Sequence, residues 1–325
     1  DSAGMKRIAV IGAGSWGIAL ALQAARAGAD VHLWARNPDS RLSNGAMPRM
    51  PDFPLPETVT ITDSLVVDAD MVLSVVPMQY FAGVLARLET AAPVVLCCKG
   101  MEPESLRFPL HILGNIRPDL TGAVLSGPNF AHEVAAGLPA AAVVAAVQPG
   151  LARVLADGLG TPLFRLYDST DVAGVQLGGA AKNVIAIASG ATMGAGLGEN
   201  ARAALVTRGL AEITRLAVAL GGQAATMAGL AGIGDLMLTC TGGASRNYRV
   251  GYALGQGATL ERVVAELGGV AEGVATAGAL ARLATEKGVS VPVMDAVTEL
   301  VSGRTDLQNV MMRLLTRPAG AELRH

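Results

Sequence analysis

The sequence predicts an α/β chain in which an N-terminal, doubly wound parallel sheet precedes a C-terminal all-helical domain. Short apolar runs alternate with helical patterns up to about residue 167, and this alternation is typical of βαβ units around a mostly parallel sheet. Beyond that point, long helical patterns dominate, separated by connections rich in glycine and threonine. We therefore predict two domains, at residues 5–171 and 172–320.

The elements expected in each domain follow from periodicity and turn residues. In the first domain, short buried strands are expected at residues 6–11, 31–34, 59–62, 71–75, 94–98, 124–125 and 140–147. A helix is expected at residues 16–27, whereas residues 37–56 are too rich in proline for regular structure. In the second domain, helical periodicity predicts helices at residues 175–189, 200–220, 248–254, 259–267, 276–287 and 291–301.

The composition excludes several classes of partner. The chain of 325 residues has a formal net charge of −2 and no basic cluster, which argues against binding to nucleic acid or to an anionic membrane surface. Its two longest uncharged runs, residues 134–152 and 216–234, are interrupted by proline or glycine. Neither supplies the roughly 20 continuous apolar residues that a spanning helix needs, so we expect no membrane insertion.

Cysteine and histidine usage suggests a metal-free protein of a reducing compartment. The three cysteines, Cys97, Cys98 and Cys240, and the four histidines show no metal-ligand spacing, so we expect no metal site. Few cysteines without a disulfide framework favour a reducing compartment. A cytoplasmic location is expected, because the sequence carries no recognisable signal peptide.

Gly12, Gly14 and Gly17 form the most informative local pattern, because they follow the apolar run 8–11 and open the Ala-rich stretch 18–27. In this context the first glycine allows a tight turn, and the second lets the backbone approach a pyrophosphate. The third lets helix and strand pack closely, so that helix N–H groups point at the phosphates. The pattern predicts a Rossmann-like, dinucleotide-binding domain; the alternative is an ordinary tight turn between strand and helix.

Lys182 is the only charged residue between Gly174 and Gly198. A helix that is apolar nearly all round is normally buried, and burial lowers the pKa of an ammonium group. Such a lysine can transfer protons near neutral pH; the alternative is a side chain that extends from the helix to solvent.

Asp235 is likewise the sole charge in residues 227–240. It either caps the helix that follows or pairs with a buried cation, for which Lys182 is the natural partner.

Ser245, Arg246 and Asn247 precede the helix expected at residues 248–254. A helix start with a forked guanidinium and small polar side chains is a good receptor for an oxyanion such as phosphate; the alternative is an ordinary solvated arginine. Lys99, and the segment 126–131, each follow an expected strand. They stand where an α/β sheet presents groups to a ligand, although turn chemistry alone also explains such residues.

Taken together, these segments resemble the NAD(P)-dependent glycerol-3-phosphate dehydrogenase family, especially its bacterial members. The resemblance spans nearly the whole chain, and the Lys-Asn and Ser-Arg-Asn segments are more specific than the glycine pattern. The matching segments are residues 12–17, 99–100, 126–131, 174–186, 200–212, 230–241 and 245–247.

The resemblance implies an oxidoreductase that interconverts sn-glycerol 3-phosphate and dihydroxyacetone phosphate by hydride transfer with NAD(P)H, supplying glycerol phosphate for phospholipid synthesis. It implies that Lys182 donates and accepts the proton at the central carbon's oxygen, in a site organised by Asn183, Asp235 and Thr239. The residues implied to bind the phosphorylated triose are Lys99, Gly127, Asn129, Lys182, Asp235, Ser245, Arg246 and Asn247. Those implied to bind the cofactor are Gly12, Gly14, Ser15, Trp16, Gly17, Arg36, Lys99, Ala131, Arg246, Val270 and Glu272.

Three positions bear on how closely the family's ligands apply to this chain. Asn129 stands where the family usually has a hydroxyl residue, and the aromatic residue that often follows the pair Glu272–Gly273 is absent. An Asp or Glu about 20 residues beyond the glycine turn would favour NAD by holding the ribose hydroxyls. This chain has Arg36 there instead, and an arginine suits a 2′-phosphate. We therefore expect NADPH as the cofactor, with NADH as the alternative.

Two other functions stay open at this point. One is a related reductase with a helical second domain, of ketopantoate or hydroxyacyl type, in which residues 245–247 would have no phosphate to bind. The other is a non-catalytic, NADPH-binding sensor. The glycine- and alanine-rich helices of the second domain could pack closely against a second subunit, so we expect a homodimer.

Overall fold

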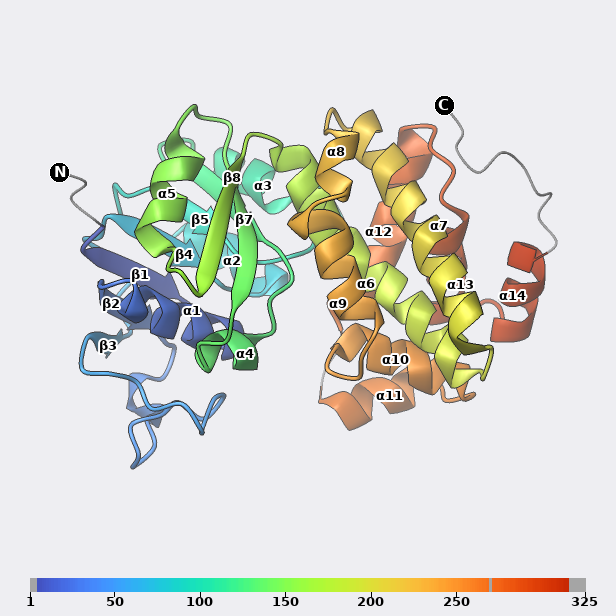
Figure 1. Cartoon of the computed structure of the whole chain (residues 1–325), viewed down its shortest axis with the longest axis horizontal. Coiled ribbons are helices and arrows are strands. Elements are labelled where there is room, and N and C mark those ends of the chain that lie inside the picture. Colours follow the sequence, from blue (N-terminus) through green and yellow to red (C-terminus); the bar gives the residue numbers. More distant parts are fainter. Residues whose placement is uncertain (1–4, 269–270, 316–325) are drawn as a thin grey trace.

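The computed structural model of the chain describes residues 5–268 and 271–315, and an eight-stranded sheet forms its N-terminal half (Figure 1). The strand order is β3-β2-β1-β4-β5-β6-β7-β8, and neighbours are parallel except for β6 and β7. The doubly wound architecture predicted from the sequence is confirmed. The strands are β1 (Arg7–Ile11), β2 (Asp30–Trp34), β3 (Val59–Thr62), β4 (Met71–Ser74), β5 (Val94–Leu96), β6 (Gly122–Ser126), β7 (Ala140–Ala145) and β8 (Phe164–Ser169).

The last strand, β8, is the one that the sequence pattern does not predict. It lies at the edge of the sheet and pairs with β7, and its residues Arg165 and Asp168 are exposed. An edge strand with one solvated face lacks the continuous apolar run of a central parallel strand. The apolar pattern that identifies the other seven strands is therefore absent from this one.

Helices cover both faces of the sheet. One face packs against α1 (Ser15–Arg26) and α5 (Leu151–Leu159), and the other against α2 (Met78–Leu85) and α3 (Pro109–Ile116). The short α4 (Ala131–Ala135) packs on α1. Residues 37–56 are irregular as expected, apart from a 3₁₀ turn, η1 (Pro38–Ser40), and they anchor to the first face through the buried Met47 and Met50.

The second half of the described chain is helical, as predicted, and is arranged around α6 (Figure 1). This helix is eight residues longer than residues 175–189, and α14 has no counterpart among the expected helices. No helix in the described residues is both long enough and apolar enough to cross a bilayer. The elements are α6 (Val172–Gly194), α7 (Gly198–Ala219), α8 (Ala224–Met227), η2 (Leu230–Gly234), α9 (Asp235–Cys240), α10 (Arg246–Gly255), α11 (Leu260–Leu267), α12 (Glu272–Glu286), α13 (Pro292–Val301) and α14 (Leu307–Leu315).

Asp171 fixes the start of α6. Its carboxylate accepts hydrogen bonds from the backbone N–H of Gly174 at 2.9 Å and of Gln223 at 2.9 Å, and from the hydroxyl of Thr226 at 2.5 Å. One buried side chain thus caps α6 and ties it to the start of α8. The helical region begins where the sequence pattern changes, and the division into two domains at this point stays a prediction.

The glycine-rich faces of the helical region pack against each other within the chain. A Cβ on Gly190 would lie 2.0 Å from the carbonyl oxygen of Tyr248, and one on Gly251 would lie 1.9 Å from that of Ile187. Gly194 on α6 and Gly255 on α10 make equivalent backbone contacts. These surfaces join α6 to α10, so they do not supply the subunit contact on which the homodimer prediction rests.

Candidate active site

The three glycines of the fingerprint have different surroundings. Gly12 has a φ of +120°, and a Cβ there would lie 2.9 Å from the carbonyl oxygen of Val75. A Cβ on Gly17 would lie 1.8 Å from the carbonyl oxygen of Gly12, whereas one on Gly14 would meet nothing within 4 Å. Packing therefore requires Gly12 and Gly17, while Gly14 leaves open space at the start of α1. An open backbone at a helix N-terminus fits the pyrophosphate of a dinucleotide.

Several other residues predicted to hold the cofactor lie near this turn. Ser15 and Trp16 form the first turn of α1, Ala131 begins α4, and α1 and α4 pack together. Arg36 is exposed two residues beyond β2 and lies over the ring of Tyr80. Glu272 begins α12 in the helical region. Val270 lies outside the described residues, so the structure says nothing about it.

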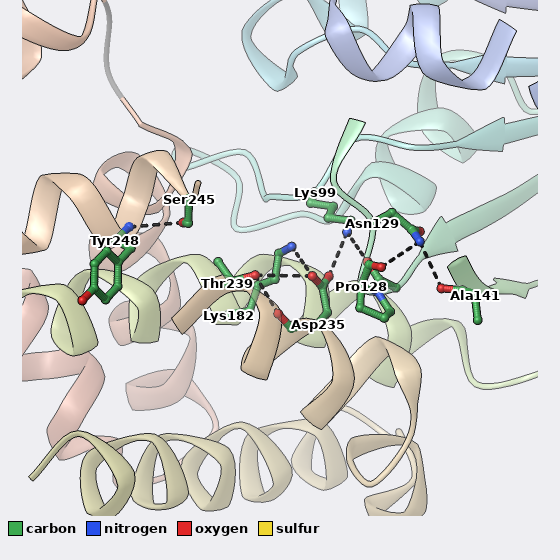
Figure 2. A network of polar contacts seen from close by, with 10 residues as sticks. Lys99, Pro128, Asn129, Ala141, Lys182, Asp235, Thr239, Ser245 and Tyr248 are labelled. Carbon is green, nitrogen blue, oxygen red and sulfur yellow. Dashed lines mark hydrogen bonds and ion pairs between the residues drawn. The ribbon is translucent and has the colours of Figure 1, made fainter. Parts of the chain in front are cut away.

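Lys182, Asp235 and Lys99 meet in one polar cluster between the sheet and the helices (Figure 2). The ammonium of Lys182 donates to Asp235 Oδ1 at 2.5 Å, and that of Lys99 donates to Asp235 Oδ2 at 2.8 Å. The side chain of Lys182 is 11% exposed and that of Asp235 is 1% exposed. Pairing of Lys182 with Asp235 is confirmed, and a lysine reaching out to solvent is ruled out.

Close backbone packing brings Asp235 to Lys182. Gly178 lies one turn before Lys182 on α6, and a Cβ there would come within 2.3 Å of the carbonyl oxygen of Ala231 in η2. The π-type turn η2 leads directly into α9, whose first residue is Asp235. Gly234 occupies the N-cap position without a side-chain cap. The carboxylate of Asp235 thus binds the lysines and does not cap the helix.

Burial and charge act in opposite directions on this cluster. The pKa of Lys182 is lowered to about 8, because burial lowers it most and the ammonium of Lys99 lowers it too, while the carboxylate of Asp235 opposes both. For Asp235, burial raises the pKa, but the two ammonium groups outweigh burial and hold the pKa below its usual range. The cluster therefore contains an ionised carboxylate and an amine that can exchange its proton near neutral pH.

The remaining residues predicted for this site surround the cluster. Thr239, one turn after Asp235, donates to the backbone carbonyl of Asp235 at 2.6 Å, and Asn183 is buried next to Lys182. The carbonyl of Gly127 accepts from the ammonium of Lys99 at 3.0 Å. Asn129 instead donates its amide to the backbone carbonyls of Pro128 and Ala141, at 2.9 and 3.1 Å (Figure 2). The Asn129 amide thus braces the turn after β6.

Ser245, Arg246 and Asn247 lie together at the start of α10. The hydroxyl of Ser245 accepts from the N–H of Tyr248 at 3.2 Å, and Asn247 Oδ1 accepts from the N–H of Gly273 at 2.9 Å. In both contacts the side chain is the acceptor, so its hydrogen donors are left for an anion. Arg246 is exposed and donates to the carbonyl of Leu267 at 3.3 Å.

Sequence reasoning missed three features near or beyond this site. It did not predict that Lys99 pairs with Asp235, because that contact joins residues 136 positions apart. It did not single out the hydroxyl of Ser126, which is buried without a hydrogen-bond partner in the described part of the chain and lies on β6 beside Lys99 and Gly179. It also passed over Glu212, a fully buried acid on α7, because α7 carries several other charges that hide it.

Comparison with known proteins identifies the family. The sequence model described as NAD-dependent glycerol-3-phosphate dehydrogenase N-terminus matches residues 7–152, and its C-terminal counterpart matches residues 171–312. This chain belongs to that family. The predicted oxidoreductase class and NAD(P) dependence are confirmed by this membership.

Full-length relatives support the glycerol-3-phosphate dehydrogenase assignment. A protein of Gluconobacter oxydans named glycerol-3-phosphate dehydrogenase (NAD(P)+) is 54% identical over 319 residues, which cover 97% of this chain and 98% of that protein. A protein of Sphingopyxis alaskensis named glycerol-3-phosphate dehydrogenase (NAD(P)+) 1 is 46% identical over 98% of each chain. The crystal structure of glycerol-3-phosphate dehydrogenase from Coxiella burnetii superposes with a TM-score of 0.90 at 37% identity, over 96% of this chain and 99% of that one. A ketopantoate reductase from Ralstonia eutropha, at 15% identity and a TM-score of 0.57, shares the fold alone.

Proposed function

We propose that this dehydrogenase interconverts sn-glycerol 3-phosphate and dihydroxyacetone phosphate with NAD(P)H. The observation that carries the proposal is the contact of Lys182 with Asp235 and of Asp235 with Lys99, next to the turn of Gly127. It combines a proton that can be transferred to the carbonyl oxygen with a positive charge that stabilises the developing alkoxide. The matching names of relatives as similar as 54% point to the same reaction.

Lys182 is the proposed acid and base. The bound nicotinamide supplies or accepts the hydride at the central carbon. In the reducing direction, Lys182 Nζ donates a proton to the carbonyl oxygen as that oxygen becomes an alkoxide. Because burial brings the pKa of Lys182 to about 8, the amine is mostly protonated at pH 7, yet it can take the proton back during oxidation. Asp235 holds the amine in place, and Lys99 adds positive charge where negative charge develops.

The segment at the start of α10 is the proposed phosphate site. Arg246 offers a forked guanidinium, and Ser245 and Asn247 keep hydrogen donors after their contacts within the fold. Binding energy gained at a remote phosphate can orient the carbonyl toward Lys182. A ketone without phosphate should therefore lose turnover as well as affinity.

A substrate panel tests the reaction. With the full chain and NADPH, oxidation of the cofactor should require dihydroxyacetone phosphate, and unphosphorylated dihydroxyacetone or ketopantoate should not replace it. Lys182→Ala should abolish turnover while leaving NADPH affinity near the parent value, because Lys182 is not proposed to hold the cofactor. A chain that binds NADPH but reduces no phosphorylated ketone would favour the sensor function instead.

Preference for NADPH is part of the proposal. Arg36 stands where an acid would favour NAD, so Arg36→Glu should raise the KM for NADPH much more than the KM for NADH. Equal effects on both KM values would show that Arg36 does not determine the preference for NADPH. A role in supplying glycerol phosphate for phospholipid synthesis, a cytoplasmic location and a homodimer also stay predictions.

A further inference from the structure

Arg36 and Tyr80 follow the two strands that flank β1. Arg36 follows β2 by two residues, and Tyr80 is the third residue of α2, which follows β4. Both strands pair in parallel with β1, and Trp34 and Ser74 lie opposite Ile11 at its carboxyl end. The two side chains therefore meet across the end of β1, where the glycine turn begins. In a dinucleotide-binding sheet this crevice receives the ligand.

The contact between them is a cation–π pair. Arg36 Cζ lies 5.4 Å from the centroid of the Tyr80 ring, which is within the usual range for this interaction. Tyr80 is 47% exposed, so its ring is open to solvent beside the guanidinium. In the part of the chain that the structure describes, no carboxylate forms a salt bridge with Arg36 within 4.0 Å. The ring face thus holds the guanidinium, and its N–H donors stay available to an anion.

We propose that Tyr80 positions Arg36 for the 2′-phosphate of NADP(H) and so contributes to the preference for NADP(H) over NAD(H). The inference rests on the proposed function in that Arg36 is the residue proposed to read this phosphate. An arginine side chain loses considerable rotamer freedom when it is fixed by a ligand. Because Tyr80 already holds the guanidinium before the ligand binds, the entropy cost of binding is smaller. Tyr80 is a positioning residue, since it acts through Arg36.

Two adenosine fragments separate this role from general adenine binding. Adenosine 2′,5′-bisphosphate carries the 2′-phosphate, and adenosine 5′-monophosphate lacks it. Titration calorimetry on the full chain should show that Tyr80→Leu weakens the bisphosphate about two- to fivefold, the range expected for an exposed cation–π contact. Affinity for the monophosphate should not change. Tyr80→Phe keeps the ring and should bind both fragments like the parent chain.

The chain provides a matched control for the loss of an exposed cation–π pair. Arg165 Cζ lies 5.8 Å from the ring of Tyr167, which is 48% exposed, on the far edge strand β8. Tyr167→Leu should therefore leave the affinity for both fragments unchanged. In an Arg36→Leu background, Tyr80→Leu should have no further effect on the bisphosphate, because the residue that it positions is gone.

Several results would overturn the proposal. Equal weakening of both fragments by Tyr80→Leu would make Tyr80 a stacking surface for adenine, and unchanged affinity for the bisphosphate would remove its role altogether. Loss of affinity in Tyr80→Phe would assign the effect to the hydroxyl group. These measurements use no triose phosphate, so their outcome is independent of turnover. A chain that discriminates the fragments as expected but does not reduce dihydroxyacetone phosphate would refute the proposed reaction alone.

Discussion

Two buried carboxylates in the helical region, Asp235 on α9 and Glu212 on α7, are each only 1% exposed, yet their surroundings differ. Asp235 lies between the ammonium groups of two lysines. Glu212 accepts backbone N–H groups from Val293 at 2.7 Å and Met294 at 3.2 Å, at the start of α13. One acid is matched by the full charges of two lysines, and the other by the partial charges of a helix N-terminus.

The difference in partners reverses the direction of the pKa shift. Burial raises the pKa of Glu212 to about 7, although the two backbone N–H groups and Arg215 oppose the rise. The two lysines instead hold the pKa of Asp235 below its usual range, despite similar burial. Two backbone dipoles therefore do not compensate for lost hydration, whereas two ammonium groups do. Asp235 keeps its charge for chemistry, and Glu212 links α7 to α13.

The largest expected effect separates the two acids by activity. Asp235→Asn should lower kcat about 100-fold, at the low end of what acid–base catalysis contributes, because Lys182 remains but loses the carboxylate that holds it. Glu212→Gln should leave kcat within about twofold, since Glu212 lies outside the cluster. Steady-state kinetics with dihydroxyacetone phosphate measures both. A similar loss in the two variants would show that the carboxylate beside the lysines has no special role.

A smaller effect concerns the pH profile of oxidation. Oxidation needs the neutral amine of Lys182, whose pKa is about 8, so kcat for glycerol 3-phosphate oxidation should rise as pH increases through about 8. Reduction needs the ammonium form and should fall over the same range. In Asp235→Asn the carboxylate that raises the pKa of Lys182 is gone, so the midpoint should move down by about one pH unit. An unchanged midpoint in this variant would mean that another group titrates.

Glu212 predicts a stability effect with a definite sign. Its pKa rises from 4.5 to about 7 on folding, so between these values the native chain holds a proton that the unfolded chain has lost. The contribution of Glu212 to the free energy of unfolding is fully present below pH 4.5 and is lost as pH rises through about 7. Over this range the free energy of unfolding falls by up to about 1.4 kcal/mol per pH unit. Denaturant unfolding at several pH values should show this slope. In Glu212→Gln the slope should decrease by up to about 1.4 kcal/mol per pH unit, which corresponds to one proton. A slope that persists in Glu212→Gln belongs to other groups.

The smallest expected effect comes from Arg215. Its positive charge lowers the pKa of Glu212, while its guanidinium donates to the carbonyl of Ser290 at 3.0 Å. Arg215→Gln should therefore raise the pKa of Glu212 by a few tenths of a unit, because a single charge near the surface is strongly screened. Side-chain carbon shifts of Glu212 followed by NMR over pH would detect the change. A downward shift would contradict the assigned electrostatics.

The two acids also show what the sequence can and cannot predict. Asp235 and Lys182 are each the only charge in an apolar stretch, so both burial and mutual pairing follow from the cost of an isolated buried charge. Glu212 shares α7 with Glu199, Arg202 and Arg208, and its depth depends on how α13 packs. Local pattern carries no information about that packing.

The same limit applies to the fold and to the rest of the site. Continuous apolar runs predict the central strands, whereas the half-exposed β8 has no such run and is not predicted. The Ser245–Asn247 segment was predicted to meet a phosphate, but the use of Ser245 and Asn247 as acceptors within the fold depends on Tyr248 and Gly273. Pairing of Lys99 with Asp235 requires the sheet and the helices to be docked. Contacts between residues that are far apart in the sequence therefore cannot be predicted from composition and spacing.

The backbone contact of α6 with α10 has a consequence for which substrates this enzyme would accept. Lys182 is carried by α6 and Arg246 by α10, and Gly190 and Gly251 leave no compressible layer of side chains between these helices. The two helices are therefore held at one spacing, which fixes the distance between the backbone positions that carry Lys182 and Arg246. On the proposed reaction, a homologue of the substrate with one extra methylene would present its carbonyl off target, even with room at the end of the site.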